Sequence, residues 1–236
     1  MKNHITVQRI NDKIDFVNLA ITLSNVDSKS REDMEAVCKY GNFNIENLTS
    51  NIQIHSDIVN KIDENNIGQK EEGDALITNL PNIPLLIFTA DCVPIAIIDK
   101  KNKAIGLVHA GWRGTYDVIA KKTIEKMEAN YNTNPKDLVC VIGPSIGPCC
   151  YEVSKDLVEK FNINFTNSTE KFYTIEEDRY KIDLWKINEY ILKECGVIEE
   201  NIINLKLCTS CNSDKFHSYR KHNQTPKRIG TILQIK

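Results

Sequence analysis

Long apolar runs are missing from this sequence of 236 residues. The longest, PLLIFTADCVPIAII (84–98), is interrupted by Asp91, Cys92 and Pro94. It is also shorter than the roughly 20 apolar residues that span a bilayer. The first ten residues, MKNHITVQRI, lack the apolar core and the small-residue cleavage site of a signal peptide. We therefore expect a cytoplasmic protein that does not cross a membrane.

An excess of charge is lacking too. The 30 Lys and Arg residues nearly balance 32 Asp and Glu residues, for a formal net charge of −2. Such a chain has no general electrostatic attraction to nucleic acid or to an anionic membrane, so neither is an expected partner. Since no repeat, low-complexity segment or clear linker divides the sequence, we predict a single domain over residues 1–236, as a monomer or a homodimer.

The middle of the chain contains the densest part of the predicted core. Nearly continuous apolar runs, typical of strands buried on both faces, occupy residues 84–91, 93–100, 103–110 and 137–143. Alternating apolar residues over 48–60 predict another strand. Apolar spacing predicts helices over 115–131 and 184–196, the second capped by Asp183. Together these elements predict an α/β (mixed α+β) fold with a mixed sheet as its core.

The segment GLVHAGWRGT (106–115) joins the third apolar run to a predicted helix. Its small residues let the backbone turn tightly. They also open space around one imidazole, one indole and one guanidinium, those of His109, Trp112 and Arg113. A plain connector does not need all three groups, so this segment predicts a functional site.

His55, Cys92 and His109 all lie at predicted strand ends or in the adjacent turns, and they form the candidate metal site. Two imidazoles and one thiolate suit zinc, and three protein ligands leave a fourth position for water or substrate. Each residue also has a plainer interpretation, as a packed thiol or as an imidazole bonded to a backbone carbonyl. A nucleophile and base pair formed by Cys92 and His109 is a competing functional interpretation.

Candidate substrate-binding groups surround these ligands in the sequence. Arg113 has the planar guanidinium that matches phosphate or developing negative charge, although pairing with a structural carboxylate is the alternative. Trp112 could stack on a purine or pack in the core. Arg220, in FHSYRKH, could hold a phosphate or an acidic group, and Tyr151 could bind substrate or anchor its loop.

The eight cysteines are expected to be thiols, metal ligands or redox pairs in a reducing compartment. In GPSIGPCCYEV, a disulfide between the adjacent Cys149 and Cys150 would be strained, so free thiols are expected, and Cys149 is a candidate pocket residue. Cys208 and Cys211 form a Cys-x-x-Cys pair without the second such pair that a zinc ribbon needs. We interpret this pair as structural support for its loop.

Six motifs in order give the sequence a recognisable resemblance: QIHSDIV, GDALIT, TADCVPIAIID, AIGLVHAGWRGT, GPSIGPCCYEV, and CTSC followed by FHSYRKH. From about Thr49 to the C-terminus the chain resembles the YfiH-type family. Members of that family are described as laccase-domain proteins, polyphenol oxidases, purine nucleoside phosphorylases or peptidoglycan editing factors. The resemblance implies a layered α/β sandwich like that of cysteine-hydrolase-like proteins.

The resemblance also implies roles. The family's zinc ligands correspond to His55, Cys92 and His109. From the chemistry of the residues themselves, we expect Arg113 to act with Cys92 and His109 as the catalytic group. The implied activity is phosphorolysis of adenosine, inosine and methylthioadenosine, with adenosine deaminase activity beside it. Two departures from the family pattern, at 18–29 and 225–228, lie outside the ligands and bear on substrate fit.

Two other activities are open for this family. One is a hydrolase that edits peptidoglycan precursors, with Cys92 as nucleophile or with a zinc-bound water. The other is a copper polyphenol oxidase. Laccase chemistry needs several copper ions with many histidines, and five histidines cannot build such a cluster, so copper is the weakest alternative.

Overall fold

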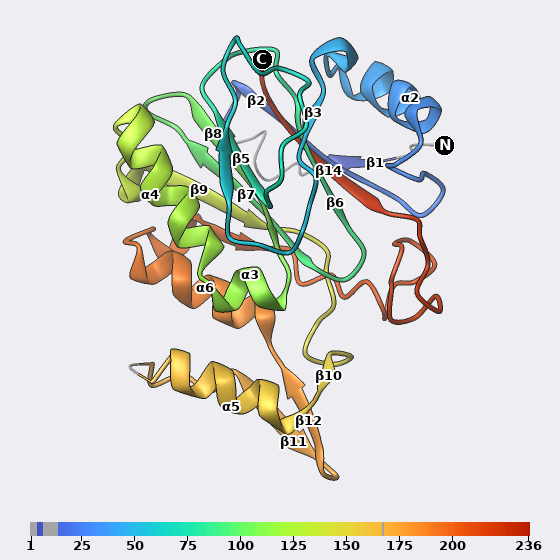
Figure 1. Cartoon of the computed structure of the whole chain (residues 1–236), viewed down its shortest axis with the longest axis vertical. Coiled ribbons are helices and arrows are strands. Elements are labelled where there is room, and N and C mark those ends of the chain that lie inside the picture. The colour runs from blue at the N-terminus through green and yellow to red at the C-terminus, as the bar shows by residue number, and fades with distance from the viewer. Residues whose placement is uncertain (1–3, 7–13, 167) are drawn as a thin grey trace.

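The computed structural model describes residues 4–6, 14–166 and 168–236. Its core is built from two large sheets that lie face to face (Figure 1). The five-stranded sheet has, in spatial order, β1 (His4–Thr6), β2 (Val17–Thr22), β14 (Ile229–Ile235), β6 (Leu85–Thr89) and β3 (Thr49–Ser50). The six-stranded sheet has the order β13 (Ile202–Asn204), β9 (Leu138–Ile142), β7 (Val93–Asp99), β8 (Ala104–Ala110), β5 (Ala75–Thr78) and β4 (Val59–Lys61).

Both sheets are mixed, as predicted. In the six-stranded sheet, the outer pairs β13–β9 and β4–β5 are parallel and the inner pairs are antiparallel. In the five-stranded sheet only β3–β6 is parallel. The parallel pairing of β9 and β13 brings the segments that follow these two strands to the same edge of the sheet.

The central strands are buried on both faces, which explains their continuous apolar sequence. Along β7, Ile95 and Ile97 belong to the core beneath the helices, whereas Ala96 and Ile98 face the core between the sheets. The helices α4 (Ile119–Tyr131) and α6 (Leu184–Glu194) cover the outer face of the six-stranded sheet. The fold is thus a layered α/β sandwich, and the predicted fold class is confirmed.

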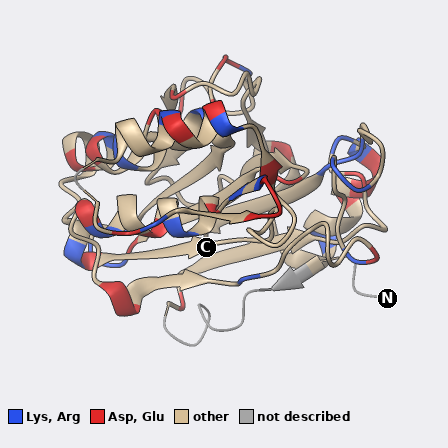
Figure 2. Cartoon of the chain, turned by 90° about the horizontal axis from the view of Figure 1, so that it is seen from below, with Lys and Arg blue, Asp and Glu red and all other residues tan. Residues whose placement is uncertain are grey.

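On the other side, α2 (Arg31–Gly41) packs on the five-stranded sheet through Met34, Val37 and Cys38. A smaller unit projects at one end of the molecule (Figure 1). It contains α5 (Lys155–Asn164) and a three-stranded sheet, in the order β10 (Glu152–Val153), β12 (Arg179–Ile182) and β11 (Tyr173–Glu176). Figure 2 shows that charges of both signs lie mainly on helices and loops, while the long strands carry few.

The strand predicted over 48–60 is wrong in its centre. Only β3 and β4, at its two ends, are strands, and Ile52, Ile54 and Ile58 are exposed. The reason is local: the backbone N–H groups of Ile54, His55 and Ser56 donate to the carboxylate of Asp74 instead of to a neighbouring strand. The alternating pattern therefore marks a loop that is held by a side chain.

The helix predicted over 115–131 is broken in two. The short α3 (Trp112–Tyr116) ends before α4 begins, and Val118 between them has a φ of 52°. A left-handed conformation is unusual for a β-branched residue, so no sequence pattern indicates this break. Asp183 caps α6 as predicted, its side chain accepting from the backbone N–H of Lys186. Within the described ranges, no helix is both long and apolar enough to cross a membrane.

Candidate functional site

The structure brings His55, Cys92 and His109 together. His109 is the penultimate residue of β8, Cys92 directly precedes β7, and His55 lies in the loop between β3 and β4. Cys92 Sγ is 3.9 Å from His55 Nε2, and the two imidazole rings meet edge to face with centroids 4.9 Å apart. One donor atom from each residue lies within 4.8 Å of the others, so the three side chains could hold one metal ion.

Asp74 positions both histidines. Its fully buried carboxylate accepts from His109 Nδ1 at 2.7 Å and from the backbone N–H of His55 at 3.1 Å. The same carboxylate accepts from Ile54 N at 3.2 Å and from Ser56 N and Oγ at 2.6 and 2.7 Å. Because Asp74 fixes the proton of His109 on Nδ1, the other ring nitrogen is directed to the site, as in metal-binding histidines.

The same contacts shift the pKa values of the metal-free site. Burial alone would raise the pKa of Cys92, but the charge of His109 and hydrogen bonds with both histidines lower it to about 6. Burial would lower the pKa of His109, but the Cys92 thiolate and the hydrogen bond to Asp74 raise it to about 9. Burial would raise the pKa of Asp74, but its bonds with His109 and Ser56 lower it to about 2. The thiolate, which is the form that binds metals and attacks electrophiles, therefore predominates at pH 7.

Gly111 allows the ligands to approach one another. A Cβ atom at this position would lie 3.1 Å from Cys92 Sγ and 3.2 Å from His55 Cδ2. Its φ of −67° is available to any residue, so the requirement for glycine comes from the close contact. The HAGWRG turn thus places a glycine where the three candidate ligands need space.

Two residues of the site have a left-handed backbone, His55 with a φ of 59° and Asp91 with a φ of 87°. Such conformations cost on the order of 1–3 kcal/mol and persist where the surroundings hold them. Asp74 holds the first. At the second, the Asp91 carboxylate accepts from Thr209 Oγ1 at 2.6 Å and from Arg220 N at 2.7 Å. Asp91 therefore ties the segment 208–220 to the turn that carries Cys92.

The three candidate ligands line a cavity of about 700 Å³, a size typical of small-molecule sites. Five cationic side chains line it, namely Lys29, Lys70, Arg113, Arg220 and Arg228. Among the residues that the structure describes, Asp91 is the one carboxylate in the lining. Four aromatic residues line it as well, namely Phe88, Trp112, Tyr151 and Tyr219. The cavity therefore combines metal-type donors, an excess of positive charge and aromatic faces.

The predicted substrate-binding residues lie in this cavity with one exception. The Arg113 guanidinium stacks over Trp112 at 4.6 Å, and that of Arg220 lies over Tyr151 at 5.7 Å. Arg220 also donates to the backbone carbonyl of Glu152 at 3.1 Å. Burial raises the pKa of Tyr151 to about 12, so its hydroxyl stays protonated.

The exception is Cys149, which is absent from the described lining and whose Sγ lies 3.4 Å from Cys211 Sγ. Cys150 Sγ lies at the same distance from Cys211 Sγ, and Cys208 completes a group of four thiols. The sequence shows one Cys-x-x-Cys pair, and the structure supplies two further thiols from the adjacent pair at 149–150. This group was not predicted, because its halves are 61 and 62 residues apart.

Asp74 was also not predicted as a site residue. The signal that could have found it is an acidic side chain directly before an apolar strand in GDALIT, within the ordered motif set. Arg228 also lines the cavity, although the sequence marks 225–228 only as a departure from the family pattern.

Known proteins resemble this chain in sequence and in fold. Residues 8–236 match the family model described as multi-copper polyphenol oxidoreductase laccase. A Clostridium acetobutylicum protein named purine nucleoside phosphorylase is 36% identical over 81% of this chain and 78% of its own length. A Bacteroides thetaiotaomicron protein of the same name is 39% identical over 69% of this chain, which spans 60% of that relative. The crystal structure of the hypothetical protein YfiH from Bacillus licheniformis has a TM-score of 0.91 at 24% identity, covering 100% of this chain and 97% of that one.

Proposed function

Since the chain belongs to the YfiH-type, laccase-domain family, we propose that it is a zinc-dependent purine nucleoside phosphorylase. Its substrates would be adenosine, inosine and methylthioadenosine, with phosphate as the second substrate. The observation that carries this proposal is the cavity, in which the donor set of His55, Cys92 and His109 lies beside five cationic side chains. The names of relatives that are 36% and 39% identical support the same reaction.

The donor set fits zinc. Sulfur and nitrogen ligands on a tetrahedral zinc ion are about 3.6 Å apart, given Zn–S and Zn–N distances of about 2.3 and 2.05 Å. Cys92 Sγ and His55 Nε2 are 3.9 Å apart, so a small movement would suffice. When bound, zinc would act as a Lewis acid that polarises an oxygen or nitrogen of the substrate or of a water.

The cationic side chains fit the second substrate. Arg113 and Arg220 are both exposed, and each is kept in place by the aromatic ring beneath it. A guanidinium binds phosphate through two parallel N–H donors. In phosphorolysis the protein must hold phosphate in line with the glycosidic carbon, and two arginines held on separate segments can supply that orientation.

The aromatic side chains fit the first substrate. Trp112 and Tyr151 are half-buried, so each presents part of a ring to the cavity. A purine can stack on such rings, and stacking on an aromatic side chain is worth about 1–3 kcal/mol per base. Deamination of adenosine at the same site is also part of the proposal. It would convert adenosine and water into inosine and ammonia and would need no phosphate.

A second function is favoured by one specific arrangement. Cys92, His109 and Asp74 have the relation of nucleophile, base and orienting carboxylate, and the pKa of Cys92 is lowered to about 6. This arrangement fits a hydrolase that edits peptidoglycan precursors. The donor set does not fit multi-copper chemistry, since the chain has five histidines and this site contains two of them.

The test is chromatography of the products after metal-analysed protein is incubated with adenosine, with and without phosphate. We expect adenine and ribose 1-phosphate only when phosphate is present, and neither with Cys92→Ala. Cys195→Ser, at a half-buried cysteine outside the cavity lining, is the matched control and should retain the activity. Absence of adenine under every condition would overturn the proposal, and turnover of muropeptide precursors would then support the hydrolase.

A further inference from the structure

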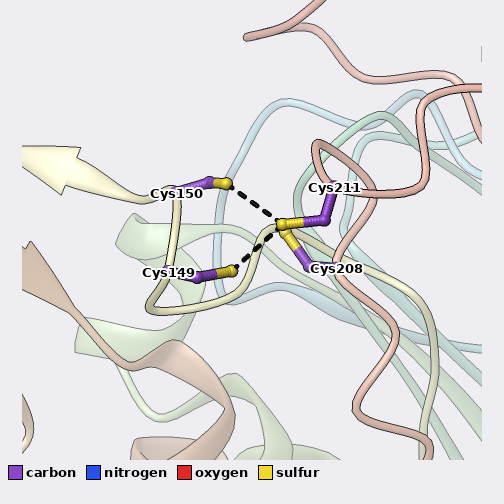
Figure 3. A group of neighbouring side chains, drawn as sticks. All are labelled: Cys149, Cys150, Cys208 and Cys211. Carbon is purple, nitrogen blue, oxygen red and sulfur yellow. Dashed lines mark hydrogen bonds between the residues drawn. The ribbon is translucent and has the colours of Figure 1, made fainter.

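Four cysteines converge from two loops at one edge of the six-stranded sheet (Figure 3). Cys149 and Cys150 follow β9, and Cys208 and Cys211 follow β13, the parallel neighbour of β9. Figure 3 shows the thiols of Cys149 and Cys150 directed toward those of the other loop. The proximity is thus built into the order of the strands.

Backbone hydrogen bonds hold the two loops in register. Ser145 N donates to the carbonyl of Leu207 at 3.1 Å, and Thr209 N donates to the carbonyl of Ser145 at 3.0 Å. Gly147 N donates to Cys208 Sγ at 3.3 Å. An N–H group directed at sulfur stabilises the thiolate, which is the form that binds metals.

The spacing of the sulfurs matches tetrahedral coordination. Cys149 Sγ and Cys150 Sγ each lie 3.4 Å from Cys211 Sγ, and all four sulfurs lie within 4.8 Å of one another. Four sulfurs on a zinc ion with Zn–S distances of about 2.3 Å are about 3.8 Å apart. Adjustments of less than about 1 Å would therefore complete the site.

Cys208 is buried in the core and Cys150 packs against it, but packing does not explain the other two cysteines. Cys149 and Cys211 are exposed, whereas cysteines that serve as small apolar residues are buried. None of the four lines the cavity, so the active-site chemistry does not explain them either. All four are free thiols, and a structural metal site at this spacing would use every one of them.

We propose that Cys149, Cys150, Cys208 and Cys211 bind one Zn²⁺ ion in a four-sulfur structural site. Binding forms four Zn–S bonds and releases to solvent the protons that the thiols still carry. No electron is transferred. This site is separate from that of His55, Cys92 and His109, and the proposal does not rest on the phosphorylase activity.

The consequence for the cavity is positional. Tyr151 directly follows Cys150, and the loop that carries Cys208 continues through Thr209 to Arg220, both bonded to Asp91. A metal ion that joins the two loops would fix two walls of the cavity at once. The four cysteines are therefore positioning residues for Tyr151 and Arg220.

The experiment is metal analysis of the full chain together with X-ray absorption at the zinc edge. We expect about two zinc ions per chain in the wild type, and about one in Cys149→Ser/Cys211→Ser, with only the mixed N and S shell left. His55→Ala should also retain about one, with a shell of four sulfurs. Cys195→Ser is the matched control and should retain both.

Cobalt loading of the wild type and of His55→Ala keeps the test decisive if the double variant does not fold. A tetrahedral four-sulfur Co²⁺ site gives strong sulfur-to-metal charge-transfer absorption, which should be present in His55→Ala. About one zinc per chain in the wild type, lost in His55→Ala, would overturn the proposal. So would disulfides among the four cysteines in protein purified without oxidant.

Discussion

Asp74→Asn should uncouple the two histidines of the candidate metal site with almost no change in side-chain volume. One oxygen of Asp74 accepts from His55 N and His109 Nδ1, and the other accepts from three donors of Ile54 and Ser56. An asparagine has one acceptor oxygen, so its NH₂ group must replace one of these two oxygens and face donors. At least two donors therefore lose their acceptor. A hydrogen bond to a charged group is worth about 1.5–3 kcal/mol, so the loss is about 3–6 kcal/mol.

The assay has two parts, urea unfolding of the metal-free protein and zinc affinity measured by competition with a chelator. Zinc affinity should fall about 10- to 100-fold, as for other groups that orient metal ligands. Asp99→Asn is the matched control, since Asp99 is equally buried and accepts three hydrogen bonds at the end of β7 that lies away from Cys92. If both variants lose stability but Asp74→Asn binds zinc as tightly as the wild type, the reasoning is refuted.

Three further predictions concern the same cavity. Gly111→Ala should weaken zinc binding about tenfold, because its Cβ would press on Cys92 and His55. In metal-free protein, the rate at which iodoacetamide alkylates Cys92 should increase as the pH rises through about 6, the pKa of this thiol. The reason is that the reactive thiolate forms above the pKa, which for an ordinary thiol is 9. Arg113→Ala should raise the KM for phosphate about tenfold or more and change the KM for adenosine little, as steady-state kinetics would show.

Each of these has a control and a contrary outcome. Gly68→Ala is the control for Gly111→Ala, because Gly68 has a φ of 75° and no atom lies near the added Cβ; it should lower stability but not zinc affinity. A Gly111→Ala variant that binds zinc as tightly as the wild type would contradict the close contact. Cys195 is the control for the alkylation of Cys92, and it should react with iodoacetamide only at higher pH, because burial raises its pKa to about 11. If the alkylation rate of Cys92 had its pH midpoint near 9, the ion pair of Cys92 with His109 would be contradicted. Equal changes in both KM values for Arg113→Ala would contradict a phosphate-binding role.

The layered fold could be predicted where local sequence determines burial. The runs 84–91, 93–100 and 103–110 contain β6, β7 and β8, because strands buried on both faces have continuous apolar sequence. The segment 48–60 could not be predicted, because its backbone is held by Asp74, some 20 residues away in the sequence. The break at Val118 could not be predicted either, since the surrounding packing imposes its left-handed backbone.

The site was predictable to the extent that chemistry and motif coincide. His55, Cys92 and His109 were selected both as an N and S donor set and from the resemblance, and the structure places them together. Contacts across many residues, such as the 35 between Asp74 and His109, leave no local pattern. The single domain, the cytoplasmic location and the oligomeric state stay predictions.

The most direct measurement of the central claim is ³¹P NMR of the protein incubated with inosine and inorganic phosphate. Phosphorolysis predicts a ribose 1-phosphate resonance that grows in step with free hypoxanthine, and neither product with His109→Ala. Hypoxanthine that forms without ribose 1-phosphate would show hydrolysis instead, and no hypoxanthine at all would contradict the assignment of this cavity to purine nucleosides.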